Sequence, residues 1–245
     1  MHPLRTTFVG EIVAEFLLPR HNSSRVMILC DGLPTLPGKH DVMHYWSRKG
    51  FWVFHIRYRG TWESGGHFLD HAPEQDIWDV VRALPTGFVS AWEKQEYRVI
   101  PSQVVVMGAS FGGTAAILST KDPCIDKAIA FAPVVDWTAP CEECLDELEQ
   151  VIVKGYGQAY RFSHEDWMRL NAGSFFQPMA EIPELDAKKI MVVHAKDDKV
   201  VSFDSVERFA TVSRCQFISR RTGGHLSTRE SIHWPLSSRI QSFLK

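Results

Sequence analysis

The pentapeptide Gly108-Ala109-Ser110-Phe111-Gly112 is the strongest chemical feature of the sequence. It follows an apolar run that predicts a strand and precedes a small-residue stretch that predicts a helix. A serine at the tip of such a strand–turn–helix points its hydroxyl out of the fold, and the sharp turn needs glycine at 108 and 112. The pattern predicts Ser110 as a nucleophile for acyl transfer. The plainer interpretation is a glycine-rich turn with an incidental serine.

A serine hydroxyl needs a base before it can attack, and a carboxylate usually orients that base. Two carboxylates, Asp197 and Asp198, follow one predicted strand near the C-terminus, and His225 follows the next strand after two glycines. The carboxyl ends of parallel strands meet at one edge of a sheet, so these groups are expected beside Ser110. His225 would take the serine proton, and a carboxylate would hold the imidazole.

Strands alternating with helices would position these groups. Apolar runs predict strands at 26–30, 51–56, 104–107, 128–131, 190–193 and 216–218, after a strand pair or one long bent strand at 8–18. The spacing of apolar residues predicts helices at 39–49, 74–84, 111–120, 203–212 and 229–244. Continuous apolar strands separated by helices are typical of a parallel sheet covered on both faces.

Residues 138–188 interrupt this rhythm, because they are too many for a simple crossover. Helical stretches are expected there at 142–153 and 164–171, and we interpret the segment as a small cap within a single domain of residues 1–245. Its aromatic residues could line an acyl or aryl pocket or form the cap's own core, and two or three are expected to face substrate. They are Trp137, just before it, and Tyr156, Tyr160, Phe162, Trp167, Phe175 and Phe176.

Together, the serine, acid and histidine motifs resemble those of the α/β-hydrolase superfamily, and the resemblance spans nearly the whole chain. It implies an α/β fold with a mostly parallel central sheet, flanking helices and a small inserted helical cap. In that superfamily the acid usually precedes a segment like Lys199-Val200-Val201, which implies Asp198 as the acid. Its neighbour Asp197 is then expected to be a turn residue. Some members instead place the acid where this chain has Asp136.

The resemblance also implies an oxyanion hole made of two backbone N–H groups. One is that of Phe111, the residue after the nucleophile. The other comes from the loop after strand 26–30, where many relatives read His-Gly and this chain reads Cys30-Asp31-Gly32-Leu33-Pro34. By position, Leu33 supplies this second N–H, because Pro34 has none.

A narrower resemblance concerns residues 57–61, Arg-Tyr-Arg-Gly-Thr, and 133–137, Pro-Val-Val-Asp-Trp. Both are similar to stretches in catalytic domains of the prolyl oligopeptidase family, which normally carries a propeller domain as well. Because 245 residues leave no room for a propeller, we expect a free-standing carboxylesterase with a small cap. A peptidase or amidase of prolyl oligopeptidase type is the alternative, and a non-catalytic ligand-binding protein is the second.

Three residues are expected to contact the substrate: Arg59, through a substrate carboxylate, and the aromatic residues Trp137 and Tyr160. Arg161 could also contact a substrate carboxylate, whereas Arg57 is expected to form an ordinary ion pair. The expected substrate is a small ester or a short acyl or peptidyl compound. The sequence does not decide between a monomer and a homodimer.

Composition excludes several classes of protein. The chain has 27 Lys and Arg against 29 Asp and Glu, a net charge of −2, which gives no support for binding nucleic acid or anionic membranes. It has no apolar run long enough to span a membrane, no signal-peptide pattern and an odd number of cysteines, five, so we expect a cytoplasmic protein.

No metal or other cofactor is expected, since acyl transfer by a serine requires none. Cys141 and Cys144 have the spacing of a zinc or redox pair but lack a second pair of ligands. His40 and His44 share a helix face without an evident third ligand.

Overall fold

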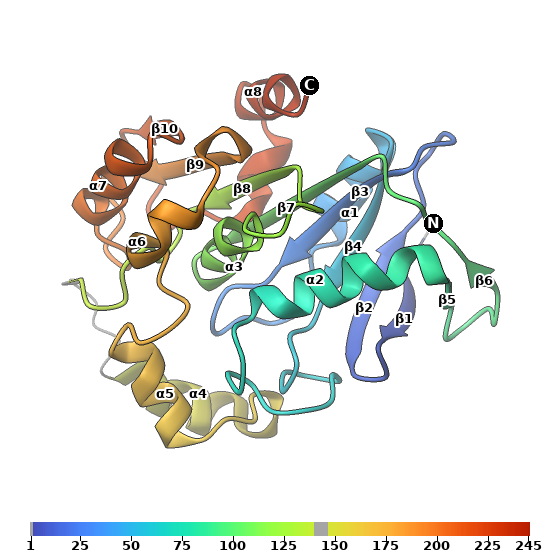
Figure 1. The fold of residues 1–245 in the computed structure, drawn as a ribbon, viewed down its shortest axis with the longest axis horizontal. Coiled ribbons are helices and arrows are strands. Elements are labelled where there is room, and N and C mark those ends of the chain that lie inside the picture. Colours follow the sequence, from blue (N-terminus) through green and yellow to red (C-terminus); the bar gives the residue numbers. More distant parts are fainter. Residues whose placement is uncertain (1, 140–146) are drawn as a thin grey trace.

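The computed structural model describes residues 2–139 and 147–245, and its centre is an eight-stranded sheet (Figure 1). The strand order is β1-β2-β4-β3-β7-β8-β9-β10. Strands β1 and β2 pair antiparallel with each other and β2 pairs antiparallel with β4, while every pair from β4 to β10 is parallel. The strands are Leu4–Phe8 (β1), Ile12–Leu17 (β2), Arg25–Cys30 (β3), Phe51–Ile56 (β4), Gln103–Ala109 (β7), Lys127–Phe131 (β8), Ile190–Ala195 (β9) and Gln216–Arg220 (β10). The predicted α/β fold with a mostly parallel sheet is confirmed.

Helices cover both faces of the sheet, as the continuous apolar strands predicted. Helices α2 (Glu74–Ala83), α3 (Phe111–Ser119) and α7 (Phe203–Ser213) bury their apolar residues in the core on one face. Helices α1 (His40–Arg48) and α8 (Leu236–Phe243) do so on the other face. Because both faces are covered, the central strands are buried along almost their whole length.

Two predicted elements differ from the structure. The region 8–18 is a strand pair whose first strand begins earlier, at Leu4, and turns at Val9 and Gly10, both of which have positive φ. The expected helix at 229–244 is a 3-10 turn, Thr228–Ile232, followed by the shorter helix α8. Pro235 lies between them, and proline cannot continue a helix because it lacks the N–H group. A two-stranded sheet of β5 (Phe88–Val89) and β6 (Glu96–Tyr97) was not predicted.

The described part of the segment expected as a cap contains several short helices joined by turns. Helix α4 (Leu148–Tyr156) overlaps the C-terminal part of the stretch expected at 142–153, whose first residues lie outside the described ones. Helix α5 (His164–Asn171) has the predicted bounds and begins with a capping box between Ser163 and Asp166. Short turns follow at Pro178–Glu181 (α6), Ile182–Glu184 (η4) and Ala187–Lys189 (η5). In Figure 1, α4 and α5 lie beyond the edge of the sheet, away from α1 and α8.

Backbone hydrogen bonds attach this segment to the loop that follows β4. The N–H of Trp62 donates to the carbonyl of Ala159 at 2.8 Å, and that of Phe68 donates to Arg161 at 2.7 Å. In return, the N–H of Arg161 donates to Gly60 at 2.8 Å. The two segments therefore run side by side and are joined by backbone hydrogen bonds, although almost one hundred residues separate them in the sequence.

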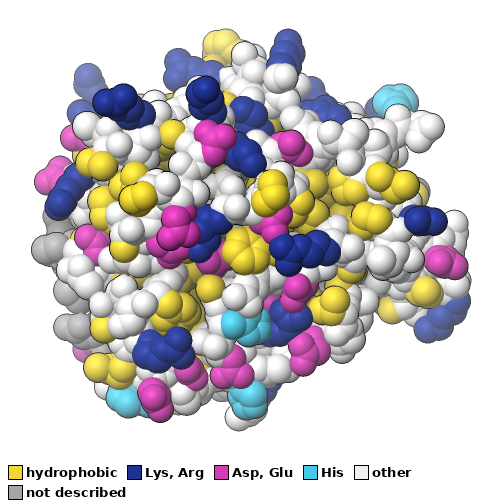
Figure 2. All heavy atoms as spheres, viewed as in Figure 1, with side chains coloured by type: hydrophobic (Ala, Val, Ile, Leu, Met, Phe, Trp, Pro, Cys, Tyr) yellow, Lys and Arg dark blue, Asp and Glu magenta, His cyan; other side chains and the backbone are white. Residues whose placement is uncertain are grey.

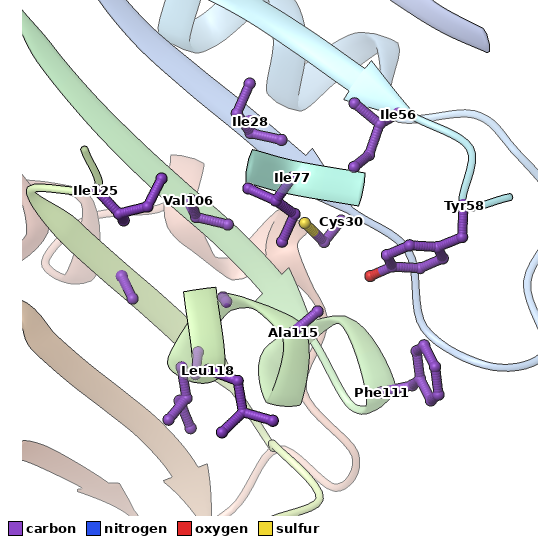
Figure 3. Close-up of a cluster of buried hydrophobic side chains, with 14 of the residues drawn as sticks. Ile28, Cys30, Ile56, Tyr58, Ile77, Val106, Phe111, Ala115, Leu118 and Ile125 are labelled. Carbon is purple, nitrogen blue, oxygen red and sulfur yellow. The ribbon is translucent and has the colours of Figure 1, made fainter. Parts of the chain in front are cut away.

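Apolar packing supports the turn that carries Ser110. The rings of Tyr58 and Phe111 meet edge to face, with centroids 5.5 Å apart, beside the buried Cys30 at the end of β3 (Figure 3). Phe176, from the inserted segment, packs on Phe111 from 4.7 Å. The first residue of α3 is thus packed by side chains from two other parts of the chain.

The surface in Figure 2 carries basic and acidic side chains interspersed over the visible face, in keeping with the small net charge. Within residues 2–139 and 147–245, no helix combines the length and the hydrophobicity that crossing a bilayer requires.

Candidate active site

Ser110 occupies a strained turn between β7 and α3. Its φ of 56° and ψ of −124° lie outside the regions that most residues adopt, and its N–H donates to the carbonyl of Phe131 at 2.9 Å. A Cβ atom at Gly108 would lie 2.0 Å from the carbonyl oxygen of Gly112, and one at Gly112 would lie 2.5 Å from that of Asp31. Neither glycine can carry a side chain unless the backbone moves, which is the reason the turn has this sequence.

Asp198 and His225 are in direct contact. Nδ1 of His225 donates to Oδ2 of Asp198 at 2.9 Å, while Oδ1 accepts the N–H groups of Val200 and Val201 at 2.9 and 3.0 Å. Burial by itself would raise the pKa of Asp198, but the bonds from His225 and Val201 hold that pKa below its usual value. The carboxylate therefore stays ionised, and it leaves Nε2 of His225 as the ring nitrogen free to act as a base.

The other two candidate acids have different partners. Asp197 is exposed and accepts the N–H groups of Gly223 and Gly224 at 3.2 and 2.8 Å, so it ties the acid loop to the histidine loop. Oδ1 of Asp136 accepts bonds from Thr138 and from Nε2 of Gln177. Within the described residues, Asp198 is the carboxylate in contact with His225.

A cavity of about 850 Å³ opens in front of Ser110 and His225. Its lining comes from residues 32–35, 109–111, 134–137, 200–202 and 225–227, together with Lys39, Ala139, Glu147, Leu148, Val151 and Ser205. Apolar side chains such as Val134, Val135, Leu148 and Val151 form much of the wall. The acid loop, the histidine loop and the inserted segment therefore all face one space.

The two expected oxyanion donors lie at this cavity. Leu33 and Phe111 both line it, and Gly32 approaches so closely that a Cβ there would lie 3.5 Å from Cβ of Ser110. Among the described residues, the N–H groups of Leu33 and Phe111 have no hydrogen-bond acceptor. Two unpaired N–H groups beside a nucleophile can receive a negatively charged oxygen.

The three expected substrate-binding residues lie in different places. Trp137 lines the cavity, and its ring N–H donates to the carbonyl of Phe176 at 2.8 Å. Tyr160 is not part of the cavity wall. Its hydroxyl instead bonds the N–H and the carbonyl of Thr35, a residue that does line the cavity. Tyr160 therefore supports the loop that carries Leu33 and does not itself face the cavity.

Arg59 lies away from the cavity. Its guanidinium pairs with Glu11 at 2.6 Å, with Asp79 at 2.8 Å and with Asp76, so three carboxylates already hold it. Arg161 bonds the carbonyl oxygens of Trp62 and Gln158 at 3.1 and 2.9 Å. Neither arginine lines the cavity, and each guanidinium is held by partners elsewhere in the protein.

Arg57 forms an ion pair, as expected, and belongs to a buried group of charges that the sequence analysis missed. It lies 3.4 Å from Glu15, and one of its nitrogens lies 3.1 Å from Nδ1 of the buried His55. Nε2 of His55 is 2.9 Å from Asp31, whose other oxygen is 3.0 Å from the Lys39 ammonium. His55 and Lys39 hold the pKa of Asp31 well below its usual value, although burial alone would raise it.

This group bears directly on the expected oxyanion hole, since Asp31 is two residues from Leu33 and Lys39 lines the cavity. The sequence hinted at this group only through Cys30-Asp31, which stand where many relatives read His-Gly. The residues that pair with one another in the group come from β2, from β4 and the residue after it, and from the residue before α1, so no local pattern identified them.

The described part of the chain contains no cluster of three or more metal-ligating side chains. His40 lies 3.7 Å from Glu15 at the protein surface. Cys141 and Cys144 lie outside the described residues.

A comparison with protein families matches residues 39–227 to the model of the prolyl oligopeptidase family. The chain belongs to this family. The match includes all three residues of the predicted triad and both stretches on which the narrower resemblance rested. No curated protein matches the chain in sequence.

Solved structures support the α/β-hydrolase fold. The α/β hydrolase GrgF from Penicillium sp. sh18 matches with a TM-score of 0.70 and 15% identity, over 99% of this chain and 97% of GrgF. The esterase Pf2001 of Pyrococcus furiosus matches with a TM-score of 0.69 and 15% identity, over 99% of this chain and 89% of the esterase. The acylaminoacyl peptidase of Pyrococcus horikoshii matches with a TM-score of 0.65 and 14% identity. This match covers 98% of the present chain but only 39% of the peptidase.

Proposed function

We propose that this protein is a serine hydrolase that cleaves carboxylic esters through an acyl-enzyme intermediate. The observation that carries the proposal is the 2.9 Å bond between Asp198 and His225 at a cavity that also contains Ser110. In the proposed reaction, His225 removes the proton of Ser110 as the serine oxygen attacks the ester carbonyl. The N–H groups of Phe111 and Leu33 stabilise the oxyanion. His225 then protonates the departing alcohol, and a water molecule activated in the same way releases the acid.

The wall of the cavity favours an ester with an apolar acyl or aryl group. Val134, Val135, Trp137, Leu148 and Val151 offer apolar surface close to the nucleophile. The similarity to Pf2001 over nearly its whole length is in keeping with an esterase, although identity of 15% speaks for the fold alone.

A peptidase or amidase is the second candidate, and it is favoured by the family and by two carboxylates. Asp136 and Glu147 line the cavity, and the ion pairs of the described residues include neither of them. The pKa of Asp136 lies below its usual value, because the bonds from Thr138 and Gln177 outweigh the effect of burial. Such a carboxylate could bind the protonated amine of a peptide.

The first test is the intact mass of the protein after treatment with a fluorophosphonate, with Ser110→Ala in parallel. We expect one adduct on the wild type and none on the variant, because only an activated serine reacts. An adduct on both proteins, or none on the folded wild type, would refute the assignment of Ser110.

The second test separates the two candidates by comparing p-nitrophenyl esters of increasing acyl length with aminoacyl p-nitroanilides. A carboxylesterase turns over the esters and leaves the anilides almost untouched. Efficient anilide cleavage that Asp136→Asn or Glu147→Gln abolishes would instead establish the peptidase.

A further inference from the structure

A second histidine lies behind the acid of the proposed triad. His194, in β9, is completely buried, and its ring stacks on Phe203, with centroids 5.8 Å apart and planes inclined by 20°. Nε2 lies 3.1 Å from the carbonyl oxygen of Val201. Nδ1 lies 3.8 Å from Oδ2 of Asp198 and has no hydrogen-bond partner among the described residues.

These contacts fix where the ring carries its proton. A carbonyl oxygen can only accept, so the proton of His194 is on Nε2 and points at Val201. Burial lowers the pKa of His194, and the nearby His225 acts in the same direction, whereas Asp198 and the Val201 carbonyl oppose them. The ring is therefore neutral near pH 7, and Nδ1 presents a bare lone pair to the carboxylate.

The neighbouring charged groups support this assignment. The titratable groups that face the ring are Asp198 and His225, while the ammonium of Lys196 lies over the stacked Phe203 ring, 5.4 Å from its centroid. Oδ1 of Asp198 is already occupied by the N–H groups of Val200 and Val201. Oδ2 thus has two imidazoles beside it, and only that of His225 offers it a proton.

We propose that His194 is a positioning residue for Asp198, which it serves in two ways. The Nε2–H bond to Val201 anchors the loop that presents Asp198, and the unprotonated Nδ1 leaves Oδ2 entirely to His225. Protonation of His194 would place an N–H in front of Oδ2 and draw that oxygen away from His225. This inference rests on the proposed function, because it assumes that the Asp198–His225 pair activates Ser110.

The test is the pH dependence of fluorophosphonate labelling in the wild type, His194→Gln and His194→Phe. Glutamine keeps an N–H for Val201 but does not titrate, whereas phenylalanine leaves that carbonyl unpaired. We expect two protonations in the acid limb of the wild type, with a limiting slope of two, and a slope of one in His194→Gln. We expect His194→Phe to label about tenfold more slowly at pH 8, the effect of losing one buried hydrogen bond. His233→Gln, at an exposed histidine, is the control and should keep the wild-type slope.

Two results would overturn the proposal. One is a slope in His194→Gln that equals that of the wild type, and the other is a labelling rate in His194→Phe that does not change. The ¹⁵N resonances of the His194 ring supply a measurement independent of labelling: they should report a neutral ring protonated at Nε2 near pH 7. A ring protonated at Nδ1, or charged, contradicts the role of His194 whether or not Ser110 reacts. Failure of the wild type to label, by contrast, refutes the proposed function.

Discussion

The hydroxyl of Tyr160 bonds both backbone groups of Thr35, accepting from its N–H at 3.0 Å and lying 3.3 Å from its carbonyl oxygen. These two residues are 125 positions apart, and Thr35 is two residues after Leu33. One phenol thus joins the inserted segment to the loop that bears the proposed oxyanion donor. Burial raises the pKa of Tyr160 to about 12, so the hydroxyl keeps its proton at physiological pH.

Tyr160→Phe should weaken the proposed oxyanion hole while it preserves the packing. The ring would still contact Trp62 and Phe68, but Thr35 would lose its partner, at a cost of about 1–3 kcal/mol. We expect kcat/KM for an ester to fall about tenfold, because small displacements of catalytic groups are costly. Tyr156→Phe is the matched control, since Tyr156 also packs on Trp62 and contacts the ring of Tyr160, and its hydroxyl has no partner among the described hydrogen bonds. Equal activities of the two variants would argue against a role for this bond.

Asp198→Asn should lower kcat by about 10⁴-fold, because an amide cannot hold the imidazole in the tautomer that the base requires. Asp197→Asn changes the adjacent, exposed carboxylate and should leave most of the activity. Ester hydrolysis by both variants, with circular dichroism as a check on folding, measures the difference. If Asp136→Asn proves more damaging than Asp198→Asn, the acid has been assigned to the wrong residue.

Glu15 should make stability depend on pH in the acid range. Contact with His55 and the charge of Arg57 lower its pKa from 4.5 to about 2, against the opposing effect of burial. Because the folded pKa is the lower one, this stabilisation is present above pH 4.5 and is lost as the pH falls towards 2. A shift of this size corresponds to roughly 3 kcal/mol.

Urea unfolding of the wild type and Glu15→Gln at several pH values measures this contribution. The two free energies of unfolding should converge as the pH falls from about 5 to about 2. A difference that stays constant over that range would show that the Glu15 charge does not contribute as described.

Gly112→Ala should disturb both the fold and the reactivity of Ser110. The new Cβ would lie 2.5 and 2.8 Å from the carbonyl oxygens of Asp31 and Cys30, which are backbone atoms and cannot turn aside. We expect a loss of about 1–3 kcal/mol in the free energy of unfolding and slower labelling by a fluorophosphonate. Gly155→Ala, in α4, has open space around it and should stabilise the protein by up to about 1 kcal/mol. A Gly112→Ala protein as stable as the wild type would contradict the steric argument.

The sequence was informative where local chemistry decides the structure. The apolar run at 51–56 has the bounds of β4, and the glycines around Ser110 predicted the turn that β7 and α3 form. It was less informative where the partners are distant. Arg59 is taken up by three carboxylates from two other segments of the chain, and no pattern around residue 59 identifies them. The single helix expected at 229–244 was wrong, because the apolar spacing continues across Pro235 whereas the helix begins only after it.

The attachment of the inserted segment to the loop after β4 uses main-chain atoms of Gly60, Trp62, Ala159 and Arg161. Such bonds do not depend on which side chains the two stretches carry. Leu148 and Val151 of α4, which face the cavity, are therefore free to be exchanged without loss of these bonds. In evolution, residues that line the cavity can therefore vary while the attachment of the inserted segment is retained.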